Sequence, residues 1–186
     1  MRARELYFFL LLLIAVIVNG SCQSNDLKNQ LENFSGSKIV FPYDKLDFRL
    51  CSFYTDTTEL SDRYSFVNYI SSVGCTSCEI SRIGRMEKTI PLEMKREIDI
   101  IYIVQIEKEK SDWVYNELCN ARIDGKVYID TCNAFINANP LLPSSKLFHS
   151  FVLDGEKNVK LVGNPFENTK LSLFPQHYNL MFFIST

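Results

Sequence analysis

The stretch from Ile98 to Gln105 constrains the fold more than any other part of this chain. It reads Ile-Asp-Ile-Ile-Tyr-Ile-Val-Gln, an almost continuous apolar run that is rich in β-branched residues. Such a run is typical of a central parallel strand that is covered on both faces. A second run, Tyr64 to Ile70, is aromatic and β-branched without glycine or proline, and it predicts another buried strand. The chain therefore contains the centre of a covered sheet.

Helical patterns and shorter strands surround these two runs. Apolar residues recur at helical spacing from Ile80 to Ile90, which predicts a helix that begins at Thr76 and is interrupted or kinked at Pro91. The Asp-Gly pair at 154–155 predicts a tight turn between two late strands. The other expected elements are a strand at Ser37–Phe41, a helix at Ser111–Cys119, a strand at Val127–Ile129, a short helix or turn at Cys132–Ile136, and hairpin strands at Leu147–Leu153 and Val159–Val162.

This order of strand, helix, strand, helix, strand and hairpin predicts an α/β domain. Its sheet would be mixed, with parallel core strands, a C-terminal antiparallel hairpin and flanking helices. The length of 186 residues suits one such domain, and the formal net charge of -2 argues against a nucleic-acid-binding protein. Whether Leu171–Ile184, which contains Pro175, forms a closing helix is left open.

The first 21 residues have the pattern of a signal peptide. Arg2 and Arg4 precede an uninterrupted apolar run from Leu6 to Val18. That run has the length of a secretory signal's apolar region and is shorter than the roughly 20 residues needed to span a bilayer. An uncleaved membrane anchor is the alternative.

The end of this segment resembles a bacterial lipoprotein signal, in which small residues precede a lipidated cysteine. Gly20 and Ser21 precede Cys22, although Asn19 stands where an aliphatic residue is usual. The resemblance implies acyl chains on Cys22 and a location in the cell envelope, anchored to the membrane and facing the periplasm or the surface. Residues 22–36 then form a polar tether ahead of a domain that covers residues 37–186.

The four residues Cys75-Thr-Ser-Cys78 follow one predicted strand and open the predicted helix. Unpaired N–H groups and the positive end of the dipole at a helix N-terminus favour a thiolate. Cys75 would be exposed and nucleophilic, and Cys78 lies on the same side, where it can resolve a mixed disulfide. An inert structural disulfide is one alternative. A zinc site is another, although Cys119, Cys132 and His149 lack a recognisable ligand spacing.

With these residues the chain resembles the thioredoxin-like superfamily, and in particular the membrane-tethered thiol–disulfide lipoproteins of the Bacteroides type. The resemblance covers roughly Ser37 to Pro165. It rests on the unit of strand, Cys75-x-x-Cys78 and helix, on the βαβ unit that follows, and on Phe148–Pro165, which is similar to the family's last hairpin. It implies a thioredoxin-like fold and a thiol–disulfide oxidoreductase without a bound cofactor. Its partners would be a protein disulfide or dithiol substrate and a redox partner protein.

Three positions depart from the family pattern. Gly74 stands where an aromatic residue usually precedes the first cysteine, and the strand at 64–70 offers only the Asn-Tyr pair at 68–69 where many members bury a carboxylate. The family also places a cis-proline before the hairpin strand, facing the disulfide. Pro143 is the candidate for this catalytic position, in competition with Pro140. These departures motivate a second hypothesis, a non-catalytic thioredoxin-like lipoprotein that binds a protein or a glycan.

The remaining cysteines and the two histidines carry less information. Cys51, Cys119 and Cys132 lie outside the motif, and free cysteines are often small buried apolar residues. A second disulfide between Cys119 and Cys132 is an open alternative. His149 and His177 are expected to be packing or surface residues.

Overall fold

The computed structural model describes residues 26–49 and 63–167. The predictions for the signal segment, Cys22, Cys51 and residues 171–184 lie outside these ranges. Within the described ranges, no helix has both the length and the apolar character needed to cross a membrane.

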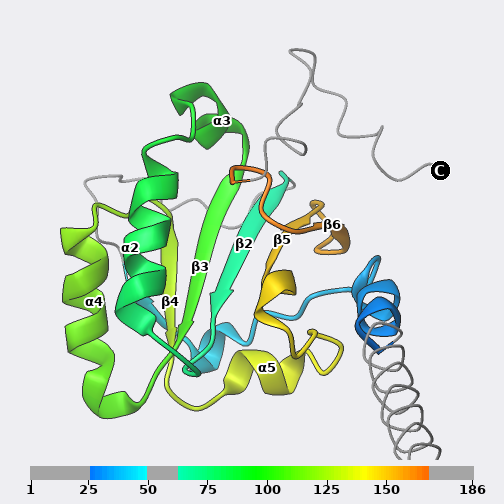
Figure 1. Cartoon of the computed structure of the whole chain (residues 1–186), viewed down its shortest axis with the longest axis horizontal. Coiled ribbons are helices and arrows are strands. Elements are labelled where there is room, and N and C mark those ends of the chain that lie inside the picture. The colour runs from blue at the N-terminus through cyan, green and yellow to red at the C-terminus, as the bar shows by residue number, and fades with distance from the viewer. Residues whose placement is uncertain (1–25, 50–62, 168–186) are drawn as a thin grey trace, which may run out of the picture.

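One mixed sheet of six strands forms the centre of the described fold, in the order β1-β4-β3-β2-β5-β6 (Figure 1). The three inner strands β2, β3 and β4 are parallel, β5 and β6 continue the sheet antiparallel, and β1 pairs antiparallel with β4. The bounds are β1 (Asp47–Arg49), β2 (Ser65–Ile70), β3 (Asp99–Gln105), β4 (Lys126–Asp130), β5 (Ser150–Leu153) and β6 (Val159–Val162). The predicted mixed sheet, with its parallel core and C-terminal hairpin, is confirmed. It is consistent with the thioredoxin-like fold that the resemblance implies.

Helices cover both faces of this sheet. α2 and α4 lie side by side on one face, and α5 lies at the carboxyl ends of the parallel strands (Figure 1). The helices are α2 (Thr76–Glu87), α3 (Leu92–Glu97), α4 (Ser111–Asn120) and α5 (Ala134–Ala138), with 3-10 turns η1 (Tyr43–Lys45), η2 (Lys108–Lys110) and η3 (Lys146–Phe148). α2 ends before Pro91, which is the N-cap residue of α3, so the predicted interruption is confirmed.

The side chains of β3 alternate between two apolar clusters, one on each face of the sheet. Ile100, Tyr102 and Val104 pack in the cluster that α2 and α4 cover. Ile101 and Ile103 pack in the opposite cluster, to which α5 and the helix of residues 26–34 contribute aromatic rings. Burial on both faces is the reason that this strand is almost continuously apolar.

The N-terminal part of the domain differs from the prediction. Residues 26–34 are helical rather than an extended tether, and the Phe34 ring is fully buried, 5.2 Å from the ring of Phe151. Leu27, Leu31 and Phe34 follow helical spacing, which is the signal that the tether interpretation missed.

The strand predicted at Ser37–Phe41 is also wrong. This segment forms only an isolated β-bridge, between Lys38 and Asn158, and the chain passes through Pro42 into η1. The edge strand β1 follows η1, and its side chains are exposed or only half-buried. Residues 46–50 read Leu-Asp-Phe-Arg-Leu and alternate between apolar and polar, which is a strand signal that the prediction missed.

Asp154 closes the hairpin between β5 and β6. Its Oδ1 accepts a hydrogen bond from the backbone N–H of Asn158 at 2.8 Å, and its Oδ2 lies 3.1 Å from Nζ of Lys160. Burial by itself would raise the pKa of Asp154, but the hydrogen bonds from Asn158 and Lys160 outweigh it and hold the pKa at about 2. A carboxyl pKa that folding lowers contributes stability above the pKa of the unfolded group, near 4, and this stability is lost as the pH falls toward 2.

We therefore expect Asp154→Asn to lower the free energy of unfolding by about 1–2 kcal/mol at pH 7, after allowance for solvent screening. The deficit relative to the unsubstituted protein should shrink as the pH falls from 5 toward 2. Urea unfolding at a series of pH values measures both. Asp44→Asn, at an exposed carboxylate in η1, is the control and should change little. A deficit that does not depend on pH would contradict the assignment to the Asp154 charge.

Candidate active site

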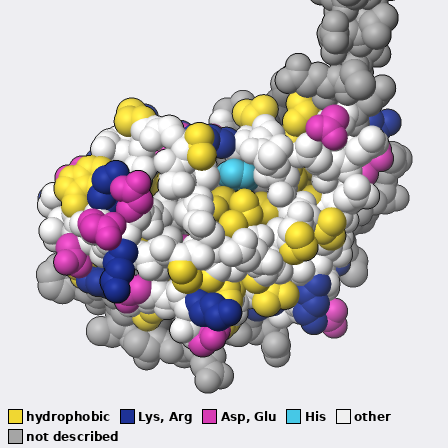
Figure 2. Space-filling view, turned by 90° about the horizontal axis from the view of Figure 1, so that it is seen from below, with side chains coloured by type: hydrophobic (Ala, Val, Ile, Leu, Met, Phe, Trp, Pro, Cys, Tyr) yellow, Lys and Arg dark blue, Asp and Glu magenta, His cyan; other side chains and the backbone are white. Residues whose placement is uncertain are grey.

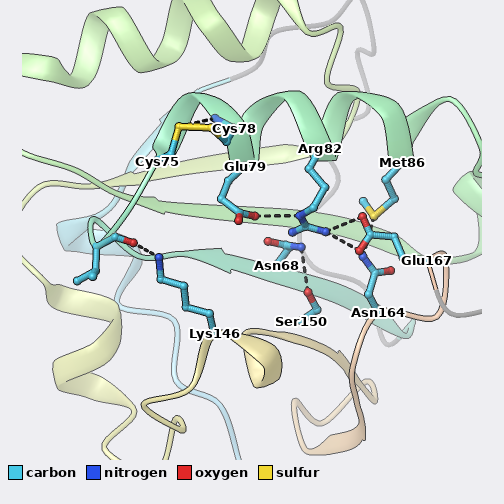
Figure 3. Close-up of polar contacts among 11 residues, drawn as sticks. Asn68, Cys75, Cys78, Glu79, Arg82, Met86, Lys146, Ser150, Asn164 and Glu167 are labelled. Atoms are coloured by element: carbon cyan, nitrogen blue, oxygen red, sulfur yellow. Dashed lines mark hydrogen bonds and ion pairs between the residues drawn. A yellow bond between two sulfur atoms is a disulfide. The ribbon is translucent and has the colours of Figure 1, made fainter.

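Cys75 and Cys78 form a disulfide where the chain leaves β2 and enters α2 (Figure 3). Their Cα atoms are 5.3 Å apart, and both residues are exposed. Exchange of a disulfide with another molecule needs two sulfurs within bonding distance and a path for the incoming sulfur. This site meets both requirements.

Cys75 is the N-cap residue of α2. Its backbone is extended, with φ -90° and ψ 93°, and its Sγ accepts a hydrogen bond from the backbone N–H of Cys78 at 3.3 Å. In the reduced protein, the same N–H and the positive end of the helix would stabilise a thiolate on Cys75. The position therefore suits Cys75 to the role of attacking sulfur.

Side chains from neighbouring strands hold the loop that precedes the disulfide. Oε1 of Gln105, at the end of β3, accepts hydrogen bonds from the Tyr69 hydroxyl at 2.8 Å and from the backbone N–H of Ser72 at 3.1 Å. The Gln105 amide in turn donates to Oδ1 of Asn133, before α5. Burial, with a smaller effect of the Asp130 charge, raises the pKa of Tyr69 to about 12, so its hydroxyl remains a donor at neutral pH.

Lys146, from η3, reaches the same loop on its other side (Figure 3). Its Nζ donates a hydrogen bond to the backbone carbonyl of Val73. It also lies 2.6 Å from the point that a Cβ on Gly74 would occupy, and Gly74 has a φ of +104°. Side chains rarely adopt that φ, so the backbone itself explains why glycine replaces the aromatic residue of the family pattern.

A cavity of about 280 Å³ lies beside this loop, between α2, β2, the start of β5 and the segment after β6. Most of the residues that line it have polar side chains. Nδ2 of Asn68 donates to Oγ of Ser150 at 3.0 Å, so a neutral pair occupies the strand position where the family often has a carboxylate. Arg82 forms ion pairs with Glu79 at 2.9 Å and with Glu167 at 2.6 Å (Figure 3).

His149 lines the same cavity and is only 7% exposed. Its Nε2 lies 2.9 Å from the carbonyl oxygen of Pro143, and because a carbonyl only accepts, Nε2 carries the proton. Burial lowers the pKa of His149. The bond to Pro143 partly offsets this effect, and the charge of Lys146 adds to it. The imidazole is therefore neutral at neutral pH.

The prediction of a cis-proline at Pro143 is wrong. None of the peptide bonds in the described ranges is cis. The segment Ser144–His149, which contains η3, separates Pro143 from β5, and His149 is the residue directly before that strand. Pro143 is buried, and the structure shows it as the acceptor that holds His149 rather than as a residue packed directly before the hairpin strand.

Cys119 and Cys132, the cysteines outside the pair in the described ranges, do not bond to each other. Cys119 and Cys132 are both free, so the alternative of a second disulfide is wrong. Cys119 precedes β4 and Cys132 follows it, and a strand of this length separates its two ends by roughly 15 Å. Among the residues that the structure describes, no group of three or more His, Cys, Asp or Glu side chains is placed to hold a metal ion.

Gln105, Lys146 and Arg82 are site residues that the cysteine motif alone does not identify. The fold brings each of them to the cavity or to the loop before Cys75. Lys146 lies in a segment without a recognisable motif, whereas Arg82 lies in α2, one helical turn after Cys78. Gln105 also had a usable signal. It ends a predicted parallel strand, and the carboxyl ends of such strands meet at one edge of the sheet.

No family model and no curated protein matches this chain. Among solved structures, it is similar to a putative electron transfer protein from Aquifex aeolicus VF5, with 12% identity over 74% of this chain and 94% of the other, at a TM-score of 0.48. It is also similar to peroxiredoxin Q from Xanthomonas campestris, with 13% identity over 72% and 93% of the two chains and a TM-score of 0.45. A thioredoxin-like protein from Porphyromonas gingivalis shares 12% identity over 63% and 74%, with a TM-score of 0.42. These values assign no activity to this chain.

Proposed function

We propose that this protein is a thiol–disulfide oxidoreductase that works through Cys75 and Cys78. The observation that carries the proposal is the exposed disulfide whose first sulfur caps the N-terminus of α2. Anchoring through a lipidated Cys22, with the domain in the periplasm or at the cell surface, is the second part of the proposal. It rests on the sequence pattern of the first 22 residues.

The exchange proceeds in two steps. The Cys75 thiolate attacks one sulfur of a substrate disulfide, a bond forms between these two sulfurs, and the other substrate sulfur leaves and takes up a proton. Cys78 then loses its proton and attacks Sγ of Cys75, which restores the disulfide of the protein and releases the second substrate thiol. The substrate gains two electrons and two protons; the protein supplies both electrons and the proton of Cys78, and the second proton comes from the solvent, which took it up when Cys75 ionised. A dithiol partner protein returns them by the same steps in reverse.

Apolar side chains beside the disulfide support a protein as the substrate. Val73 is 71% exposed and Leu147 is 78% exposed. Lys146, which directly precedes Leu147, contacts the carbonyl of Val73, so the segments that carry the two apolar side chains touch. Figure 2 shows hydrophobic side chains gathered around a histidine on the face that is seen from below in Figure 1. A docking protein would bury such a surface.

The test is a mixed-disulfide trap. Cys78→Ser removes the resolving sulfur, so the full-length protein, reduced and then mixed with a protein disulfide such as insulin, should accumulate as a covalent adduct through Cys75. Cys75→Ser is the matched control and should form no adduct. Mass spectrometry without reductant measures both. The non-catalytic binding protein is the correct alternative if neither variant forms an adduct and if Cys75 of the unsubstituted protein alkylates only at alkaline pH.

A further inference from the structure

We propose that Lys146 is a positioning residue for Cys75: its ammonium group holds the loop before the disulfide and favours the charged form of the Cys75 sulfur. This inference rests on the proposed function and identifies what regulates the reactivity of the same site. The residue lies in η3, 73 positions along the chain from Val73, whose carbonyl it contacts.

The Lys146 ammonium group lies directly at the loop before Cys75. Nζ of Lys146 donates to the carbonyl of Val73 and lies 2.6 Å from the Cβ position of Gly74. Gly74 is bonded directly to Cys75, so the ammonium group lies against the two residues that lead into the N-cap of α2 (Figure 3). A side chain at position 74 would compete with it for this space. The glycine therefore leaves room for the lysine, and the lysine covers the place that the family gives to an aromatic residue.

The charged groups near this loop differ in whether they are paired with an opposite charge. Arg82 lies on the same side of α2, but Glu79 and Glu167 pair with it at 2.9 Å and 2.6 Å, and this trio carries a net negative charge. His149, next to η3, is neutral for the reasons given above. Within the described ranges no ion pair engages Lys146, so its positive charge is not neutralised by a partner. Among these groups, Lys146 is the cation without a paired carboxylate, and it contacts the two residues that precede Cys75, so it is the one that can favour a thiolate there.

A nearby cation stabilises the thiolate relative to the thiol, and so it stabilises the reduced protein relative to the disulfide. The Cys75 thiol would therefore lose its proton at a lower pH, and the disulfide would be more easily reduced. Because Lys146 is exposed, solvent screens part of this effect. We expect a shift of about half a pH unit rather than the larger shifts of buried pairs.

The experiment compares Lys146→Gln, which keeps a donor and removes the charge, with Lys146→Arg, which keeps both. In the reduced full-length protein, Lys146→Gln should raise the midpoint of the pH profile of Cys75 alkylation by about 0.5 unit. Above that midpoint, the equilibrium with glutathione should favour the protein disulfide about threefold more, which corresponds to about 15 mV. Lys146→Arg should restore both values. Lys88→Gln, at the other end of α2 and roughly 18 Å away, should change neither.

Salt provides a readout that a purely structural role would not affect. Raising the ionic strength to about 1 M shortens the screening length to roughly 3 Å. The alkylation midpoint of the unsubstituted protein should then rise toward that of Lys146→Gln, whose own midpoint should move less. An unchanged midpoint and an unchanged equilibrium in Lys146→Gln would overturn the role of Lys146 while the protein still exchanges disulfides. If the unsubstituted protein exchanges none, the proposed function itself fails.

Discussion

Cys75→Ser is expected to lower the rate at which the protein reduces a disulfide by roughly a thousandfold or more, because it removes the attacking sulfur. The hydroxyl of serine has a far higher pKa than a thiol, and the N-terminus of α2 cannot compensate for that difference. The measurement is the reduction of insulin with a dithiol as the electron source, at a pH where Cys75 is charged.

Two further variants separate a loss of chemistry from a loss of structure. Cys132→Ser removes another exposed cysteine that is outside the pair, and it should leave the rate unchanged. Cys78→Ser should keep the first attack and lose turnover, because the mixed disulfide cannot be resolved inside the protein. Full activity of Cys75→Ser would exclude the mechanism.

Lys95→Met is expected to lower the free energy of unfolding by about 3–5 kcal/mol. Glu87 is only 3% exposed, with its Oε1 accepting from the Tyr102 hydroxyl at 2.8 Å and its Oε2 lying 2.7 Å from Nζ of Lys95. The same ammonium group also pairs with Asp124 at 2.9 Å. Without Lys95, the buried carboxylate of Glu87 would lose its counter-ion, and an uncompensated charge in the interior is costly.

Urea unfolding measures this effect, and a double variant tests its origin. Lys95→Met combined with Glu87→Leu removes both charges and should recover most of the lost stability, because an apolar pair can replace a buried ion pair at little cost. The control is Lys28→Met. Lys28 pairs with Glu32 at 3.7 Å on the surface, where both side chains are more than half exposed, and its loss should cost about 0.5 kcal/mol or less. A double variant no more stable than Lys95→Met would show that packing, rather than charge, causes the loss.

The central strands could be predicted from sequence because their patterns are local. β3 is apolar at nearly every position since both of its faces are buried, and β2 is similar. The helix at residues 26–34 escaped prediction although it has an apolar stripe, because its polar residues suggested a tether. β1 lies in a run of only five alternating apolar and polar residues, and its pairing with β4 fixes it as a strand.

Some residues of the site could likewise be predicted from local patterns, and others could not. Cys75 and Cys78 are three residues apart and share one turn of a helix, so a local pattern was enough to find them. The prediction of a cis-proline at Pro143 rests on its position before the predicted hairpin strand. The structure instead places η3 and His149 in that interval, with no cis peptide bond in the described ranges. A short segment without periodicity, such as η3, has no sequence pattern from which the positions of its side chains could be predicted.

By itself, the sequence determined that this chain forms a mixed α/β sheet and that a pair of cysteines opens a helix at the end of one of its strands. Both can be recognised from short local patterns, namely the almost continuous apolar runs of strands that are buried on both faces and the start of a helix. The tertiary contacts determine which groups lie at the loop before Cys75 and line the cavity beside it: Lys146 against the loop, His149 bonded to Pro143, and the neutral pair of Asn68 and Ser150. These contacts join segments that are distant in the chain, and the packing of β2 against β5 and α2 creates them.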